Sequence, residues 1–211
     1  MTDVVIWGCG GHGREVNMLC EHAGVRVLGF LDERPEMKGR LIDNVPVLGT
    51  LADIASLRDR VMVICAGVGD PALKRRFSDM TAADGFTLSP PIVHPSAHVS
   101  SCVSVGPGTV VCAGVVMTVN VRIGRHVIVN VNATISHDAS IDDFATVAPG
   151  VNVCGGVSVG EGAYLGVGCS IRERIQIGAW SVIGGGSFVR SNVPERTVYA
   201  GVPAVLRKHL P

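Results

Sequence analysis

The stretch from residue 92 to residue 193 repeats every six residues. IVHPSA (92–97), HVSSCV (98–103), SVGPGT (104–109) and VVCAGV (110–115) open it, and FVRSNV (188–193) closes it. The second position of every unit is aliphatic: Val93, Val99, Val105, Val111, Met117, Ile123, Val129, Ile135, Ile141, Val147, Val153, Val159, Leu165, Ile171, Ile177, Ile183 and Val189. An uninterrupted period of this kind is typical of a parallel β-helix, in which each unit supplies one short strand and one turn.

The period also predicts how the coils stack. If three units close one coil, residues 18 apart lie above one another and their aliphatic side chains form one apolar column. The sixth position is mostly small or β-branched, as a tight corner requires. A glycine often follows the aliphatic position, which we interpret as a turn with unusual φ and ψ (Gly106, Gly124, Gly160, Gly166, Gly178 and Gly184). A β-sandwich, with strands roughly every 8–12 residues, does not produce this period.

The composition agrees with a narrow apolar column. The chain of 211 residues is 47% hydrophobic but only 4% aromatic. Its net charge of zero argues against nucleic acid or an anionic membrane as a partner. The N-terminal residues show no secretion signal, and no long apolar stretch predicts a membrane span, so we expect a cytoplasmic protein. The seven cysteines form no C-x-x-C pair and are interpreted as reduced thiols that fill small apolar positions.

The N-terminal part of the chain follows a different pattern. Short apolar runs predict strands at residues 4–7, 25–32 and 61–67, and helices are expected at residues 14–22 and 72–83. Three prolines at positions 90, 91 and 95 mark a linker. We therefore expect a Rossmann-like α/β domain over residues 1–88, followed by a left-handed parallel β-helix over residues 89–211.

A glycine-rich loop lies between the first predicted strand and helix. Gly8, Gly10 and Gly13 match G-x-G-x-x-G, a spacing that lets backbone N–H groups approach a diphosphate. Asp32 ends the second strand, where a carboxylate can meet a ribose hydroxyl. The domain is long enough for one mononucleotide half only, which favours a nucleoside diphosphate with an attached group over NAD. The alternative is a turn that only packs a helix on a strand, and a polar His12 in the loop weighs against it.

One unit of the repeat carries a titratable pair. In TISHDA (134–139), His137 and Asp138 lie one coil below Gly155 and Gly156, two residues without side chains. We expect this arrangement to leave open wall beside an imidazole that acts as a base near neutral pH. The alternative is a solvated surface histidine without a role. We find no metal-ligand spacing and no nucleophile motif, so we expect no metal, and Cys154 is a weak candidate for an acyl carrier.

With these motifs, the chain resembles the left-handed β-helix acyltransferases of the sialic-acid O-acetyltransferase type. Within that group it is most similar to the bacterial enzymes that N-acetylate UDP-4-amino sugars for bacillosamine, or GDP-perosamine. The resemblance rests on G-x-G-G-H-G at 8–13, FLDE at 30–33, SHD at 136–138, GGG at 184–186 and AGVPA at 200–204. It implies an acetyl-CoA-dependent N-acetyltransferase acting on a nucleotide-linked 4-amino-4,6-dideoxy sugar for surface glycan biosynthesis. It also implies a homotrimer with active sites between adjacent subunits.

The resemblance assigns roles to individual residues. His137 matches the general base, and Asp138 the acid that orients it, although several relatives have the longer glutamate there. The positions that match nucleotide-sugar contacts are Gly10, Gly11, His12, Asp32, Glu33, Arg34 and, more weakly, Gly67. Those that match acetyl-CoA contacts are Gly155, Val167, Gly185 and Thr146, the last of which stands where a relative has a histidine.

Other functions are compatible with the same residues. The same histidine could serve O-acetylation of a sugar hydroxyl, as in sialic acid, and a β-helix can also be a non-catalytic scaffold. An NAD-linked oxidoreductase is a third possibility that the loop alone does not exclude. The sequence reveals neither the base of the nucleotide nor the sugar and the position of its amine.

Overall fold

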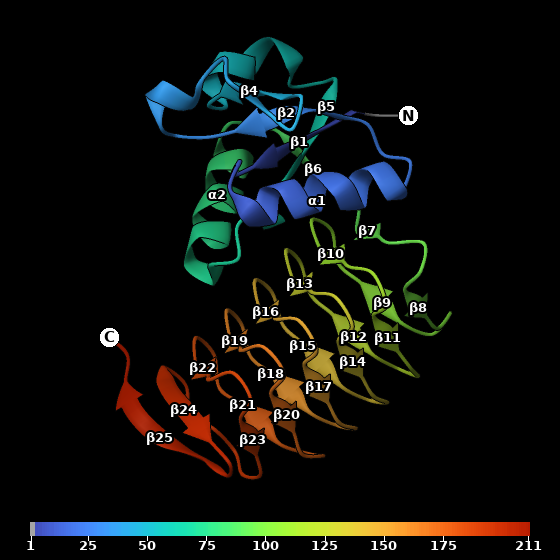
Figure 1. Cartoon of the computed structure of the whole chain (residues 1–211), viewed down its shortest axis with the longest axis vertical. Coiled ribbons are helices and arrows are strands. Elements are labelled where there is room, and N and C mark those ends of the chain that lie inside the picture. Colours follow the sequence, from blue (N-terminus) through green and yellow to red (C-terminus); the bar gives the residue numbers. More distant parts are fainter. Residues whose placement is uncertain (1–2) are drawn as a thin grey trace.

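The computed structural model describes residues 3–211, so the first two residues of the predicted N-terminal domain, and of the stretch read for a secretion signal, lie outside it. Figure 1 shows an α/β layer stacked on the side of a long prism of short strands. The last strand of the α/β sheet ends at Leu88, and the first strand of the prism begins at Ile92. Within residues 3–211, no helix is long and apolar enough to cross a membrane.

The N-terminal sheet has the order β3-β4-β2-β1-β5-β6 and is parallel except between β3 and β4. Its strands are β1 (Asp3–Trp7), β2 (Val27–Leu31), β3 (Leu41–Ile42), β4 (Val45–Gly49), β5 (Val61–Ile64) and β6 (Thr87–Leu88), with helices α1 (Gly11–His22) and α2 (Pro71–Ala83). Short 3₁₀ helices span Pro35–Met37, Ala52–Leu57 and Cys65–Gly67. The strand predicted at residues 61–67 therefore ends three residues early, at Ile64, because residues 65–67 form a 3₁₀ turn.

The two helices cover opposite faces of this sheet. Trp7 stacks on Phe77 of α2 with ring centroids 4.4 Å apart. Helix α1 packs its buried Val16 and Leu19 in one cluster with Val110 and Ile128 of the prism. Helix α1 therefore lies between the sheet and the prism, as Figure 1 shows.

The prism is a parallel β-helix with three faces. The first face contains β7 (Ile92–Val93), β10 (Val110–Val111), β13 (Ile128–Val129), β16 (Thr146–Val147), β19 (Tyr164–Leu165), β22 (Val182–Ile183) and the terminal hairpin β24 (Thr197–Gly201) and β25 (Ala204–His209). The second contains β8 (His98–Val99), β11 (Val116–Met117), β14 (Thr134–Ile135), β17 (Asn152–Val153), β20 (Ser170–Ile171) and β23 (Phe188–Val189). The third contains β9 (Ser104–Val105), β12 (Arg122–Ile123), β15 (Ser140–Ile141), β18 (Ser158–Val159) and β21 (Gln176–Ile177).

The predicted stacking is confirmed. Val110 pairs with both Ile92 and Ile128, and Thr134 pairs with Asn152, each 18 residues away. The aliphatic second positions from Val111 to Val189 form one continuous buried core together with the small residues of the sixth position. Each coil therefore contributes three aliphatic side chains to a column that no single coil could bury.

The interpretation of the glycines after the aliphatic position is wrong. None of those six positions has a positive φ; the left-handed corner residue comes two positions later, as at Gly108, or at Asn120 and Asp138 with φ 55° and 60°. A Cβ on Gly106 would lie 2.6 Å from the carbonyl group of Gly124 in the next coil. These glycines therefore allow close backbone contact between coils.

Candidate active site

His137 and Asp138 lie at the corner that follows β14, where the chain passes from the second face to the third. Nδ1 of His137 is 2.9 Å from Oδ2 of Asp138. This contact lowers the pKa of Asp138, so the carboxylate accepts a hydrogen bond from Nδ1–H. The imidazole is held in one tautomer, and its Nε2 keeps a free lone pair on a side chain that is 65% exposed. The side chain of Asp138 is one methylene shorter than that of glutamate and still reaches the imidazole of His137.

The gap left by Gly155 is filled by the histidine. A Cβ on Gly155 would lie 2.5 Å from both Cε1 and Nε2 of His137, so the ring lies against this glycine. Gly155 itself is buried. The expectation of open wall above the pair is therefore wrong at Gly155, which seats the imidazole. Its contact with acetyl-CoA stays a prediction.

A second polar cluster lies at the carboxyl ends of β1 and β2. It lines a cavity of about 340 Å³ together with Gly10 and Phe77. Arg34 donates to both oxygens of Asp32 from Nε at 2.8 Å and Nη2 at 2.9 Å, and this lowers the pKa of the carboxyl below its usual range. The thiol of Cys9 also donates to Asp32 at 3.0 Å, and burial with this contact raises the pKa of Cys9 to about 11. Asp32 is thus mostly covered, and Arg34 and Glu33 are the more exposed charged groups that line the cavity.

Of the other residues predicted to contact a nucleotide, some are open to a ligand or line this cavity and some do not face it. Gly10 and Gly11, at the start of α1, have no atom near the place where a Cβ would stand, so their backbone is open to a ligand. Glu33 lines the same cavity and pairs with Arg76 at 2.6 Å.

His12 and Gly67 do not face the cavity. Nε2 of His12 is buried without a hydrogen-bond partner among the described residues, and its Nδ1 lies 3.2 Å from Glu15. Gly67 is buried, and its missing side chain allows contact with the carbonyl of Trp7. Packing against β1 accounts for a glycine at this position, and its contact with a nucleotide sugar stays a prediction.

Val167 and Gly185 lie together, but far from the histidine along the fold. They occupy adjacent coils at the corner that precedes β20 and β23, and Val167 is 58% exposed. His137 and Gly155 follow β14 and β17 of the same face. Because all these strands are parallel, the two pairs stand at opposite edges of the second face. One chain alone cannot join them into one groove.

Thr146, which is predicted to contact acetyl-CoA, is covered in this chain. Thr146 is only 4% exposed, because α2 covers the first face at this coil. Its hydroxyl donates to the carbonyl of Gly69 and accepts from Nζ of Lys74, both at 2.8 Å. Both hydrogen-bonding directions of the hydroxyl are used within the chain.

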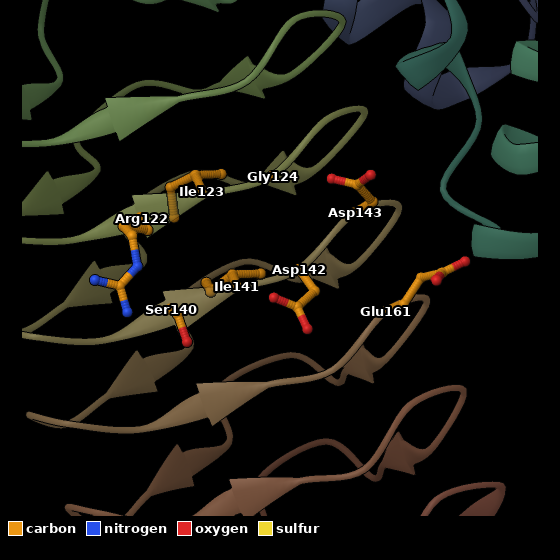
Figure 2. A pocket seen from close by; sticks show the side chains of 8 residues that line it. All are labelled: Arg122, Ile123, Gly124, Ser140, Ile141, Asp142, Asp143 and Glu161. Atoms are coloured by element: carbon orange, nitrogen blue, oxygen red, sulfur yellow. The ribbon is translucent and has the colours of Figure 1, made fainter.

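A further hollow of about 430 Å³ lies on the third face of the prism and contains none of the predicted site residues. Figure 2 shows its carboxylates, with Asp143 directed toward the neighbouring coil at Gly124 and Glu161 toward the N-terminal domain. Asp143 pairs with Arg125 and Glu161 with Arg75. Among residues 3–211, no group of histidine, cysteine and acidic side chains could hold a metal ion.

Two residues of the candidate site were not predicted from the sequence. Asn120, one coil below Asp138, donates to its Oδ1 at 3.3 Å and so supports the carboxylate from the side opposite the histidine. Counting 18 residues back from Asp138 finds Asn120, but the count does not show where its amide points. No sequence motif indicates the contact of Cys9 with Asp32. This contact depends on the pairing of β1 with β2.

Comparison with known proteins decides the family. Residues 3–81 match the family model of the PglD N-terminal domain. A histidine-to-asparagine mutant of perosamine N-acetyltransferase from Caulobacter crescentus, solved with CoA and GDP-perosamine, is 32% identical. The superposition covers 99% of this chain and 98% of that chain with a TM-score of 0.90. The chain belongs to the nucleotide-amino-sugar N-acetyltransferase family.

Other solved structures are similar over nearly the whole chain. The acetyltransferase domain of PglB from Neisseria gonorrhoeae, solved with acetyl coenzyme A, is 30% identical, with 98% of this chain and 99% of that chain covered and a TM-score of 0.88. WeeI from Acinetobacter baumannii, 23% identical, shows the same fold over 98% of this chain and all of its own, with a TM-score of 0.86. A search of curated proteins finds no match. The predicted family and fold class are thereby confirmed, and the protein is an acyltransferase.

Proposed function

We propose that the protein transfers the acetyl group of acetyl-CoA to the amine of a nucleotide-linked amino sugar, of the 4-amino-4,6-dideoxy class. The observation that carries this proposal is the His137–Asp138 pair, in which Asp138 fixes Nδ1 while the imidazole side chain as a whole is 65% exposed. The relatives support the substrates, because the Caulobacter enzyme is solved with CoA and GDP-perosamine and the Neisseria domain with acetyl coenzyme A.

The chemistry needs one base and good positioning. Nε2 of His137 removes a proton from the sugar amine as the amine nitrogen bonds to the acetyl carbon. The C–S bond of the thioester then breaks, CoA leaves as a thiolate, and the proton on His137 can return to it. Asp138 stabilises the imidazolium that forms in between, and Asn120 holds Asp138. Because a thioester is already activated, no covalent enzyme intermediate is needed.

A nucleotide-linked acceptor explains the N-terminal cavity better than a free sugar does. The open backbone of Gly10 and Gly11 at the start of α1 offers N–H groups and the positive end of the helix dipole to a diphosphate. Arg34 adds a cationic group at the mouth of the same cavity. A free sugar would use neither feature.

We propose a homotrimer, in which the edge that carries His137 in one subunit meets the edge that carries Val167 and Gly185 in the next. The second face supports this, since it exposes Val116 and Phe188, which are 37% and 39% accessible. Such a contact would complete a groove for acetyl-CoA that the single chain lacks. We place the reaction in the cytoplasm, where nucleotide sugars and acetyl-CoA are available, as a step in surface glycan biosynthesis.

The proposed role of His137 is tested by His137→Ala. We expect turnover to fall by about 10²–10⁴-fold, the usual contribution of a positioned base, while CoA binds with unchanged affinity in calorimetry. Ser136→Ala at the preceding position is the matched control, and its turnover should stay close to wild type. An alanine variant that turns over at the wild-type rate would remove His137 from the mechanism.

A further inference from the structure

Helix α2 is shared between the nucleotide cavity and the β-helix. Leu73 and Phe77 line the cavity beside Asp32 and Arg34. Other side chains of the same helix contact successive coils of the prism. Ser78 lies 2.9 Å from Nε2 of the buried His126, and Arg75 pairs with Glu161 at 2.9 Å.

Lys74 is the central contact of this series. It is fully buried, although lysine almost never is unless it is paired. Its Nζ donates to the carbonyl of Ala145 and to the hydroxyl of Thr146, both at 2.8 Å. Thr146 in turn donates to Gly69, just before α2, so three hydrogen bonds fix the start of this helix to β16. Burial lowers the pKa of Lys74 well below its usual value, and its Nζ has an N–H group for each of these two acceptors.

The bonds of Lys74 end on the first face of the coil that carries the catalytic pair, across the prism from the corner that holds His137. Ala145 and Thr146 follow His137 by eight and nine residues, across β15 and the next corner. The other large contact between the two parts of the chain is the apolar packing of α1 on Val110 and Ile128. Apolar contacts are non-directional, whereas hydrogen bonds lose strength when their angle changes. Directional contacts also join Ser78 to His126 and His22 to His94. Lys74 is the one among them whose side chain makes two hydrogen bonds to the β-helix.

We propose that Lys74 is a positioning residue for acyl transfer, which fixes the orientation of the nucleotide-binding domain on the β-helix and thereby the placement of the sugar amine at the catalytic base. This inference rests on the proposed N-acetyltransferase function. Lys74 does not touch the substrates; it acts through α2, one side of which borders the cavity.

The test is Lys74→Met, which keeps the apolar stem and removes the two donated bonds. Thr146 keeps its acceptor at Gly69, so the change leaves no hydroxyl hydrogen without a partner. We expect kcat to fall by about tenfold or more, since small displacements of bound reactants are costly, while KM for acetyl-CoA and the Kd for the nucleotide stay within about twofold. Arg75→Met is the matched control, because its ion pair is exposed on both sides and surface pairs contribute little.

The outcomes separate positioning from stability. A Lys74→Met variant that melts at a lower temperature but keeps the wild-type kcat when folded would overturn the proposal.

If the wild-type protein acetylates no nucleotide-linked amino sugar, the proposed function fails, and the role of Lys74 is read separately by amide hydrogen exchange. Exchange over residues 71–83 and 145–147 should then accelerate in Lys74→Met and not in Arg75→Met. Equal exchange in the two variants would overturn the role of Lys74 as well.

Discussion

Replacing Gly155 by alanine would place a methyl group against the imidazole of His137. The new Cβ would lie 2.5 Å from Cε1 and Nε2 of the ring and 3.0 Å from Nδ1. Ordinary contacts between such atoms are about 3.5 Å or longer, so the ring has to move outward by about 1 Å. A displacement of this size costs about 10²-fold in turnover, or about 2.7 kcal/mol of transition-state stabilisation.

The same substitution should leave the fold intact. Gly155 does not have a positive φ, so alanine fits its backbone. The His137 side chain is largely exposed and can swing toward solvent. A glycine replaced by alanine at a compatible position usually stabilises a protein by about 0.4–1 kcal/mol, because the unfolded chain loses freedom. The melting temperature of Gly155→Ala should therefore equal or slightly exceed that of the wild type.

The assay is the release of CoA thiol from acetyl-CoA with a saturating nucleotide amino sugar, combined with thermal unfolding. Cys154→Ala is the control on the same corner, and full activity there also excludes an acyl-cysteine intermediate. Turnover of Gly155→Ala within about threefold of wild type would refute the seating of His137 on Gly155, since about 10²-fold is expected.

Three further predictions concern the pair, the cavity and the buried lysine. Asp138→Ala frees the imidazole to rotate and should lower kcat by about tenfold or more with KM for acetyl-CoA unchanged, in steady-state kinetics. Asp32→Asn weakens the bidentate contact that orders Arg34 and should raise KM for the nucleotide sugar, while KM for acetyl-CoA and the melting temperature change little. Since the unfolded chain protonates Lys74 more readily than the folded one, the stability of the wild type relative to Lys74→Met should rise between about pH 8 and about pH 9.5 in thermal melts of both proteins, because the buried cysteine thiols, whose raised pKa values act in the opposite direction, are common to the two.

The β-helix could be predicted from the sequence because one position in six carries the core. A single register, 18 residues per coil, then places every corner residue above its neighbours. That arithmetic found His137, Asp138 and Gly155 as one group. It did not show that the ring lies on the glycine, because register fixes backbone neighbours and leaves the side-chain rotamer open.

Contacts between the N-terminal domain and the β-helix could not be predicted from the sequence. The bonds of Lys74 to Ala145 and Thr146 span more than seventy residues and depend on how α2 docks on the first face. A lysine in an amphipathic helix is ordinarily solvent-exposed, so nothing in the local pattern signals its burial. For the same reason Thr146 was assigned to acetyl-CoA from its match to a relative, although α2 covers it here.

The most direct test of the proposed function is the chemistry of the product. Wild-type protein is incubated with acetyl-CoA and GDP-perosamine, or the UDP- and dTDP-linked 4-amino sugars, and the product is analysed by mass spectrometry before and after mild alkali. We predict one acetyl group per sugar that survives alkali, as an amide does, and that fails to form with His137→Ala. An acetyl group that alkali removes, or acetylation of a free sugar in preference to every nucleotide-linked one, would contradict N-acetylation of a nucleotide-linked amino sugar.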